Sequence, residues 1–259
     1  MRWNTAPPRE VTAYDVVRAF KLFCNPVSPV GARPYYLSTI SGLAEYCARF
    51  DSVPGTVAAI RTFVTSHEID GVRAADDTTL VFRLLAPATD FLNLLAMPFT
   101  APVPVEYLAY SPDGPESRQH TISNGPYQIV RYVQNREFLM ERNPAWDART
   151  DPIRPAYVDR IRIRLGLDAQ LQQLQIEAGT ADLSFGQWVP PAELAALLTL
   201  EDPTVLLSPA GDVYGSFTYL ALNVVGPNNG GALKRLDVRR AIALAVDKVE
   251  SAGSLPAET

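Results

Sequence analysis

Two histidines, His67 and His120, have the side-chain type best suited to acid–base catalysis. His120 lies in a polar stretch that also contains Ser111 and Asp113, the residue types of a hydrolase triad. A triad is a spatial arrangement, so neighbours in the sequence do not by themselves make one. The sequence contains no G-x-S-x-G, H-E-x-x-H or phosphate-loop motif. We therefore expect both histidines to be surface residues and the chain not to be an enzyme. A hydrolase that uses His120 and Ser111 is the alternative.

Charged residues offer two further kinds of chemistry. Asp76 and Asp77 could act as an acid–base pair, but they lie at a turn-like position, where solvated carboxylates are common. Arg160, Arg162 and Arg164 alternate with apolar residues and could bind an anion. Strict alternation predicts a half-exposed strand. We expect its arginines to face solvent and to have partners on neighbouring strands.

The two cysteines, Cys24 and Cys47, have no histidine close to them in the sequence. This arrangement is not a zinc-site pattern, and we expect no metal site and no cofactor. Two interpretations of the cysteines stay open. They are either two buried thiols or one disulfide, and a disulfide would imply an oxidising compartment.

Several aromatic residues stand where loops meet predicted elements. Tyr35 and Tyr36 leave a proline-rich loop, Trp188 follows a predicted strand, and Tyr214 and Phe217 lie in one crowded segment. Aromatic side chains at loop ends can line a ligand cleft. Each of these residues also fits a place in the hydrophobic core, so both interpretations stay open.

Length and composition limit the classes of protein to consider. The chain has 259 residues, of which 47% are hydrophobic and 20% are charged, which is an ordinary globular composition. The net charge is −5 and no run of basic residues occurs, so we expect no nucleic-acid partner. No apolar run is long enough to cross a membrane. Residues 1–20 lack the pattern of a secretory signal.

Apolar spacing divides the first half of the chain into short elements. It predicts helices over residues 13–23 and 40–50 and another from about residue 57. A T-x-x-D stretch before the first helix resembles a capping box. Residues 71–87 are typical of strand, turn and strand. The prolines of residues 99–108 indicate an extended segment.

The pattern of residues changes at "SNGPY", Ser123 to Tyr127. Asn124 and Gly125 can take left-handed backbone angles and Pro126 fixes its own φ, so we expect a fixed turn and the principal domain boundary here. A predicted hairpin follows directly. Residues 158–185 then predict a strand–helix–strand unit, with a helix that ends near Gly179.

Six segments, taken in order, resemble one known family. They are "REVTAYDVVRAFKLF", "ADDTTLVFRLLAP" with "FLNLLA", "SNGPYQIVRYVQNREFLMERNPAWD", "AYVDRIRIR", "LQIEAGTADLSF", and "YLALNV" with "LDVRRAIALAVDK". Together they are similar to the extracytoplasmic solute-binding proteins of ABC transporters, family 5, which bind peptides, dipeptides and nickel. The sequence departs from the family in having Ser-Asn-Gly for Gly-Thr-Gly and an extended "GPNNGGALKR" segment.

The resemblance implies an α/β fold with mixed sheets, of the periplasmic-binding-protein-like type II, two-lobed and with an incomplete third lobe. Residues 1–122 would be part of the small lobe and residues 123–215 part of the first large lobe. Residues 216–259 would be the start of the third lobe plus a tail. Family members are about twice as long, so the resemblance implies a truncated chain.

The function implied is capture of peptides or similar small solutes in an inter-lobe cleft, for delivery to an ABC transporter permease. The protein would be a monomer outside the cytoplasm, and a lipoprotein at full length. Tyr36 from the small lobe and Trp188, Tyr214 and Phe217 from the first lobe are the expected ligand contacts. Two alternatives remain: a regulatory or interaction module with the same fold, and a non-functional fragment.

Overall fold

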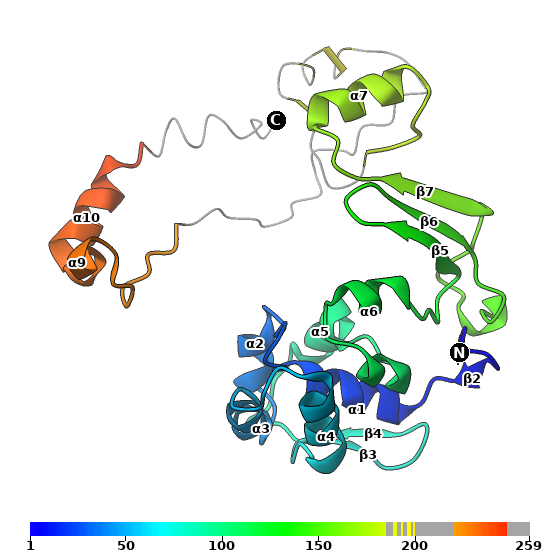
Figure 1. Cartoon of the computed structure of the whole chain (residues 1–259), viewed down its shortest axis with the longest axis horizontal. Coiled ribbons are helices and arrows are strands. Elements are labelled where there is room, and N and C mark those ends of the chain that lie inside the picture. The colour runs from blue at the N-terminus through cyan, green and yellow to red at the C-terminus, as the bar shows by residue number, and fades with distance from the viewer. Residues whose placement is uncertain (185–188, 191–192, 194–195, 198, 200–219, 248–259) are drawn as a thin grey trace. The chain divides into compact units, whose positions relative to one another are not determined.

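The computed structural model describes residues 1–184, 189–190, 193, 196–197, 199 and 220–247. The chain divides into two compact units, Met1–Gly166 and Leu167–Thr259, here called unit 1 and unit 2. In Figure 1 unit 1 combines a group of short helices with small sheets. All strand pairs in the described ranges are antiparallel. The expected α/β class, a combination of helices and sheets, is confirmed, although the described sheets are antiparallel rather than mixed.

Unit 1 contains six short α-helices. They are α1 (Ala13–Leu22), α2 (Arg33–Leu37), α3 (Leu43–Phe50), α4 (Val57–Ser66), α5 (Phe91–Ala96) and α6 (Pro115–Gln119). The backbone N–H of Thr12 donates to the Asp15 carboxylate over 3.1 Å, so the predicted T-x-x-D start of α1 is confirmed. The side chain of Thr56 accepts from the backbone N–H of Ala59 and caps α4. Helix α2 was not expected, because its segment reads as a proline-rich loop.

Helix α3 begins at a glycine that no other residue could replace without strain. Gly42 has a φ of +71°, and a Cβ at this position would lie 2.7 Å from the Cβ of Asp70. Both the left-handed backbone and the close approach therefore require glycine. The chain entering α3 is in this way held directly against the segment that leads into the next strand.

Two small sheets accompany the helices. Strands β1 (Arg2–Trp3) and β2 (Arg9–Glu10) form one pair, and β3 (Val72–Ala74) and β4 (Leu80–Phe82) form the predicted hairpin. The expectation of an extended segment over residues 99–108 holds only for residues 101–104. Two 3-10 helices, η1 (Pro98–Thr100) and η2 (Val105–Ala109), occupy the rest, because proline is compatible with the start of a helix.

Buried aromatic side chains dominate the core of the helical part. Phe20, Tyr36, Tyr46 and Phe50 have no exposed surface, and α1, α3 and α4 all contribute to the same apolar cluster. A buried phenyl group is among the largest single contributions to hydrophobic stability. The helices of unit 1 are therefore held together mainly by aromatic packing.

A three-stranded sheet completes unit 1. Its order is β5 (Tyr127–Val133), β6 (Glu137–Arg142) and β7 (Arg160–Arg164), and a short 3-10 helix, η3 (Ala148–Thr150), lies between β6 and β7. Figure 1 shows the three strands side by side. The predicted hairpin of β5 and β6 is confirmed, and its turn uses Asn135 at a φ of +58°. The half-exposed strand predicted over Arg160 to Arg164 is also confirmed.

Unit 2 has fewer described elements. They are α7 (Ala169–Glu177), α9 (Asn228–Gly231), η4 (Ala232–Lys234) and α10 (Leu236–Ala245). Asp168 caps α7 by accepting from Leu171 N–H, and Gly179 takes a φ of +64° directly after the helix, as predicted. The second strand of the expected strand–helix–strand unit is absent from residues 181–184. Alanine, aspartate and serine in that stretch favour strands weakly.

The division between the two units differs in place from the boundary expected at residues 122 and 123. The chain passes from unit 1 to unit 2 at Gly166, so the Ser123–Tyr127 segment lies inside unit 1. The reason is that the β5–β6–β7 sheet belongs with the residues before it. The lobe assignment of residues 1–122, 123–215 and 216–259 remains a proposal.

Candidate functional site

Tyr36, an expected ligand contact, lies in the hydrophobic core of unit 1. Its side chain is 0% exposed, its ring packs against Phe20 and Phe23, and its hydroxyl donates to the Leu94 carbonyl over 2.8 Å. Burial raises the pKa of this hydroxyl. A side chain without accessible surface has no face for a ligand, so the geometry gives no support to a binding role for Tyr36. The sequence interpretation of Tyr36 as a core residue is the one that fits.

The other three expected contacts, Trp188, Tyr214 and Phe217, lie outside the residues that the structure describes. Their role in binding remains a proposal.

Cys24 and Cys47 form a disulfide that joins the end of α1 to α3. Their Cα atoms are 5.2 Å apart, within the range that a disulfide requires. The sequence left two buried thiols or one disulfide open, and the structure contains the disulfide.

The Ser123–Tyr127 segment is fixed by hydrogen bonds to two distant parts of unit 1. Asn4 and Ser123 exchange two bonds, from Asn4 N–H to the Ser123 carbonyl (3.0 Å) and from Ser123 N–H to Asn4 Oδ1 (2.7 Å). The buried side chain of Asn143 donates to the Gly125 carbonyl (2.9 Å), and Asn143 N–H donates to the Pro126 carbonyl (2.8 Å). The segment is therefore a junction of three chain segments.

The expected use of left-handed backbone angles at Asn124 and Gly125 is wrong, because neither residue has a positive φ. The bend at Gly125 and Pro126 is instead held from outside by Asn143. The sequence signal for this anchor was the asparagine of the Arg-Asn-Pro stretch.

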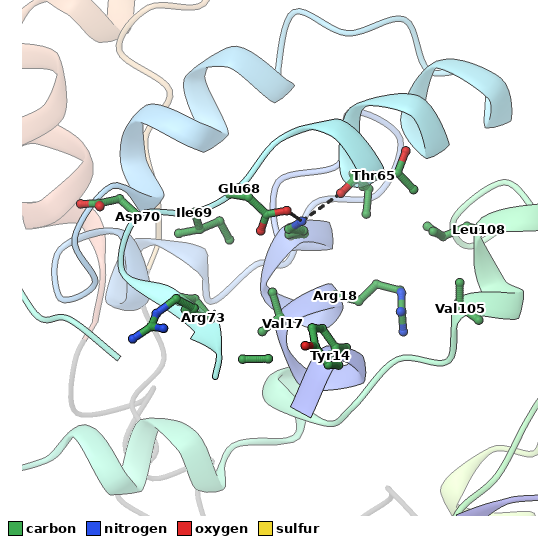
Figure 2. Close-up of a pocket in the computed structure, with 14 residues that line it drawn as sticks. Tyr14, Val17, Arg18, Thr65, Glu68, Ile69, Asp70, Arg73, Val105 and Leu108 are labelled. Atoms are coloured by element: carbon green, nitrogen blue, oxygen red, sulfur yellow. Dashed lines mark hydrogen bonds and ion pairs between the residues drawn. The ribbon is translucent and has the colours of Figure 1, made fainter. Parts of the chain in front are cut away.

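A groove of about 600 Å³ lies beside α1 in unit 1. Figure 2 shows Tyr14, Val17 and Arg18 of α1 between β3, which carries Arg73, and η2, which carries Val105. Its volume falls in the range of small-molecule sites. Its lining residues are Tyr14, Val17, Arg18, Lys21, Val64, Thr65, Glu68, Ile69, Asp70, Val72, Arg73, Ala74, Val105 and Leu108. None of these lining residues is a histidine or cysteine.

The charges along this groove are mostly neutralised. The buried Lys21 ammonium donates to Glu68 Oε1 over 2.7 Å and to the Val64 carbonyl over 3.1 Å, and Arg83 pairs with Asp70. The groove therefore combines apolar side chains, such as Val17 and Val72, with charged groups that are held in ion pairs.

A buried charge cluster lies at the start of α1 and was not foreseen from the sequence. Asp15 is 1% exposed and accepts from Trp3 Nε1 (2.9 Å), from both terminal nitrogens of Arg9 (3.0 and 3.2 Å) and from Arg18 (2.6 Å). Arg9 also donates to both carboxylate oxygens of Glu106 in η2 (3.0 and 2.9 Å). The cluster ties β1 and β2 to α1 and η2.

Opposing effects act on the acidity of this cluster. Burial by itself would raise the pKa of Asp15, but hydrogen bonds from Arg9, Trp3, the Thr12 N–H and Arg18 outweigh it and lower that pKa. The Arg9 hydrogen bond likewise lowers the pKa of Glu106. Both carboxylates are therefore charged at neutral pH. The cluster serves to hold β1 and β2 against α1 and η2.

The arginine row of β7 has cross-strand partners, as expected. Arg162 donates to Glu137 Oε2 over 2.8 Å and Arg160 donates to Glu141 Oε1 over 2.7 Å. Glu137 is also paired with Arg131 of β5, and its hydrogen bond from Arg162 lowers the pKa of Glu137. An anion-binding role for the row has no observation in its favour.

The two histidines have local partners. The His67 ring stacks on Phe63 with centroids 4.1 Å apart, and the His120 ring stacks on Tyr110 at 4.6 Å. His120 Nδ1 lies 2.8 Å from the Glu116 carbonyl of the same helical turn. Within the described ranges, no group of three or more His, Cys, Asp or Glu residues could hold a metal ion. Likewise, no helix in those ranges has the length and apolar character that crossing a bilayer requires.

Comparison with known proteins gives consistent results. The sequence model "Bacterial extracellular solute-binding proteins, family 5 Middle" matches residues 9–255. The periplasmic oligopeptide-binding protein OppA of Salmonella typhimurium is 26% identical over 99% of this chain and 43% of its own length. Di/tripeptide-binding protein 4 of Pseudomonas aeruginosa is 27% identical over 84% of this chain and 36% of its own length. The chain thus spans less than half the length of these relatives.

Solved structures agree with this result. Clavulanic acid biosynthesis oligopeptide binding protein 2 has a TM-score of 0.61 and 30% identity, covering 76% of this chain and 33% of that protein. OppA of Haemophilus influenzae in complex with RPPGFSPFR has a TM-score of 0.57 at 20% identity, covering 76% and 34%, and shows the shared fold. Since the family match extends over nearly the whole sequence, the chain belongs to family 5 of the bacterial extracellular solute-binding proteins.

Proposed function

We propose that this chain is part of the ligand-binding component of an ABC importer and captures peptides or similar small solutes. The observation that carries the proposal is the similarity to an oligopeptide-binding protein over 99% of the chain, within a family match over residues 9–255. A second relative is a di/tripeptide-binding protein, and a solved relative at 30% identity is an oligopeptide-binding protein. Peptide is therefore the solute class that the relatives favour.

The proposed mechanism is capture without chemistry. Two lobes close on the solute, and the solute stabilises the closed state by its higher affinity for that state. The closed protein then docks on the permease subunits of the importer. We propose that it works as a monomer outside the cytoplasm, without a cofactor and without catalytic activity.

Trp188, Tyr214 and Phe217 are the proposed ligand contacts. Aromatic side chains contribute a large contact area and a polar edge, which suits peptide side chains of varied size. Asn124, Gly125 and Pro126 are proposed to be structural residues of a lobe junction. The bonds from Asn143 to this segment are consistent with that role.

A thermal melt of the chain tests the proposal, with a pool of short peptides as the probe and a pool of free amino acids at equal mass as the control. A ligand that binds only the folded state raises the melting midpoint in proportion to the logarithm of its concentration. We expect peptides to raise the midpoint and free amino acids not to do so. A sharp transition that ignores peptides would reject the proposed solute class for this chain.

Substitutions then test the proposed contacts. Trp188→Ala, Tyr214→Ala and Phe217→Ala are expected to reduce the peptide-induced shift by at least half, while the midpoint without peptide changes little. Tyr157→Ala is a matched control, because the Tyr157 side chain is highly exposed and is not a proposed contact. An equal loss of the shift in the control would show that the effect is not specific to the proposed contacts.

A further inference from the structure

The aromatic rings of unit 1's core form two groups, each connected by stacked, tilted or edge-to-face ring pairs. The first ring cluster contains Phe20, Phe23, Tyr36, Phe82 and Phe91. The second ring cluster contains Tyr46, Phe50, Phe63 and His67. Ring pairs connect the members inside each cluster, and none of the ring pairs among the described residues joins one cluster to the other.

The disulfide joins a residue next to the first ring cluster to a residue next to the second. Cys24 directly follows Phe23 of the first ring cluster, and Cys47 directly follows Tyr46 of the second. Both cysteines are buried, at 0% and 3% exposure, within the apolar core. The covalent bond thus connects the end of α1 to α3 from inside the core.

We propose that the Cys24–Cys47 disulfide is a redox-dependent clamp between the two ring clusters. The helical core of unit 1 then reaches its full stability only in an oxidising compartment. This inference concerns the maturation of the fold and does not depend on the solute that the protein binds. Formation takes two electrons and two protons from the Cys24 and Cys47 thiols and passes them to a disulfide oxidant such as oxidised glutathione, which leaves as two thiols.

Two physical effects give the clamp its strength. Closing the loop from residue 24 to residue 47 removes conformational freedom from the unfolded chain. The bond also couples two groups of rings that share one apolar core but are not joined by a ring pair among the described residues. Because both sulfur atoms are buried, a reductant reaches them only after local opening of the core.

The reduced chain keeps local interactions of its own. The Asn25 side chain donates to the Leu22 and Ser28 carbonyls and accepts from the N–H groups of Val27 and Ser28, which fixes the turn after α1. We therefore expect the reduced protein to keep its helices and to lose mainly the coupling between the clusters.

The test compares the oxidised protein with protein reduced by tris(2-carboxyethyl)phosphine in denaturant and refolded in the same reductant. Mass spectrometry after alkylation counts the free thiols in each sample. The chain has only two cysteines, so a C24A/C47A double variant is a matched control on which the reductant has no target. Hydrogen exchange of the amides in α1 and α3 provides a second readout.

We expect the oxidised protein to melt roughly 10 °C above the reduced protein. The double variant should melt near the reduced protein and not respond to reductant. Amides of α1 and α3 should exchange through one common opening when oxidised and through separate openings when reduced. Two free thiols in protein refolded under an oxidised glutathione buffer, or midpoints within about 2 °C of each other, would overturn the proposal.

Discussion

The helical core and the three-stranded sheet of unit 1 contain the same kinds of interaction at very different depths. Phe20 in the core is fully buried, whereas the stacked pair of Tyr132 and Phe138 in the sheet is only partly buried. Asp15 and its partner Arg18 have side chains 2% and 16% exposed, whereas Glu137 and its partner Arg162 in the sheet are 11% and 62% exposed. Water weakens an exposed ion pair. Loss of one partner from a buried pair is far more destabilising, because the other charge stays buried. The depth of a contact therefore determines how much it contributes to the free energy of unfolding.

The largest expected difference concerns the aromatic rings. Phe20→Ala should lower the free energy of unfolding by about 4 kcal/mol, because it removes a buried ring and leaves a cavity. Phe138→Ala, the matched change in the sheet, should cost about 1–2 kcal/mol, because solvent can fill the space. Urea unfolding of both variants measures the two values. Equal losses would mean that the sheet is as well packed as the core, and the comparison would fail.

Ion pairs are expected to show the next largest difference. Asp15→Asn should cost about 3 kcal/mol, because the buried Asp15 carboxylate is the charged acceptor for Trp3, Arg9 and Arg18. Glu137→Gln in the sheet removes the partner of Arg131 and Arg162, and its effect should be much smaller because those arginines remain solvated. Denaturant midpoints of the two variants give the contrast directly. A loss in Glu137→Gln as large as that in Asp15→Asn would contradict it.

The dependence of stability on pH tests how much the buried charge of Asp15 contributes. Folding lowers the pKa of Asp15, so its contribution is present above the unfolded pKa of about 4 and is lost as the pH falls through the lower folded value. The difference in unfolding free energy between the unsubstituted protein and Asp15→Asn should therefore be constant from pH 7 to about pH 5 and shrink below pH 4. Titrating carboxylates outside this cluster affect both proteins and cancel in the difference, whereas Glu106, which shares Arg9 with Asp15, does not cancel. A difference that stays constant down to pH 2 would show that the charge on Asp15 contributes nothing.

Local signals predicted the elements of unit 1 well. The T-x-x-D start of α1, the helix from residue 57 and the hairpin of β5 and β6 follow from side-chain spacing and turn residues near in the sequence. Proline misled the interpretation of residues 99–108, because it excludes the interior of a helix but not its first turn.

The spacing of residues in the sequence could not predict contacts between residues that are far apart in it. The sequence marks Asp15 as a capping residue, but Glu106, which shares Arg9 with it, comes from a distant segment. Tyr36 looked like a cleft residue because it follows a loop, whereas its burial depends on rings from α1. The family, by contrast, could be inferred from the order of six segments, since each segment is recognised from its local sequence alone.

The smallest expected effects come from two buried tyrosines of the core and have opposite signs. Tyr36 donates its hydroxyl proton to the Leu94 carbonyl, whereas the buried Tyr46 hydroxyl has no hydrogen-bond partner in the described part of the chain. Tyr46→Phe removes an unsatisfied polar atom and should raise the free energy of unfolding by about 1 kcal/mol, while Tyr36→Phe loses a hydrogen bond and should lower it by about 1 kcal/mol. The two substitutions remove the same atom from the same core, so each is the control for the other in chemical unfolding. If Tyr46→Phe were as destabilising as Tyr36→Phe, the Tyr46 hydroxyl would have a partner, such as a buried water, and depth alone would no longer explain the energetics of this core.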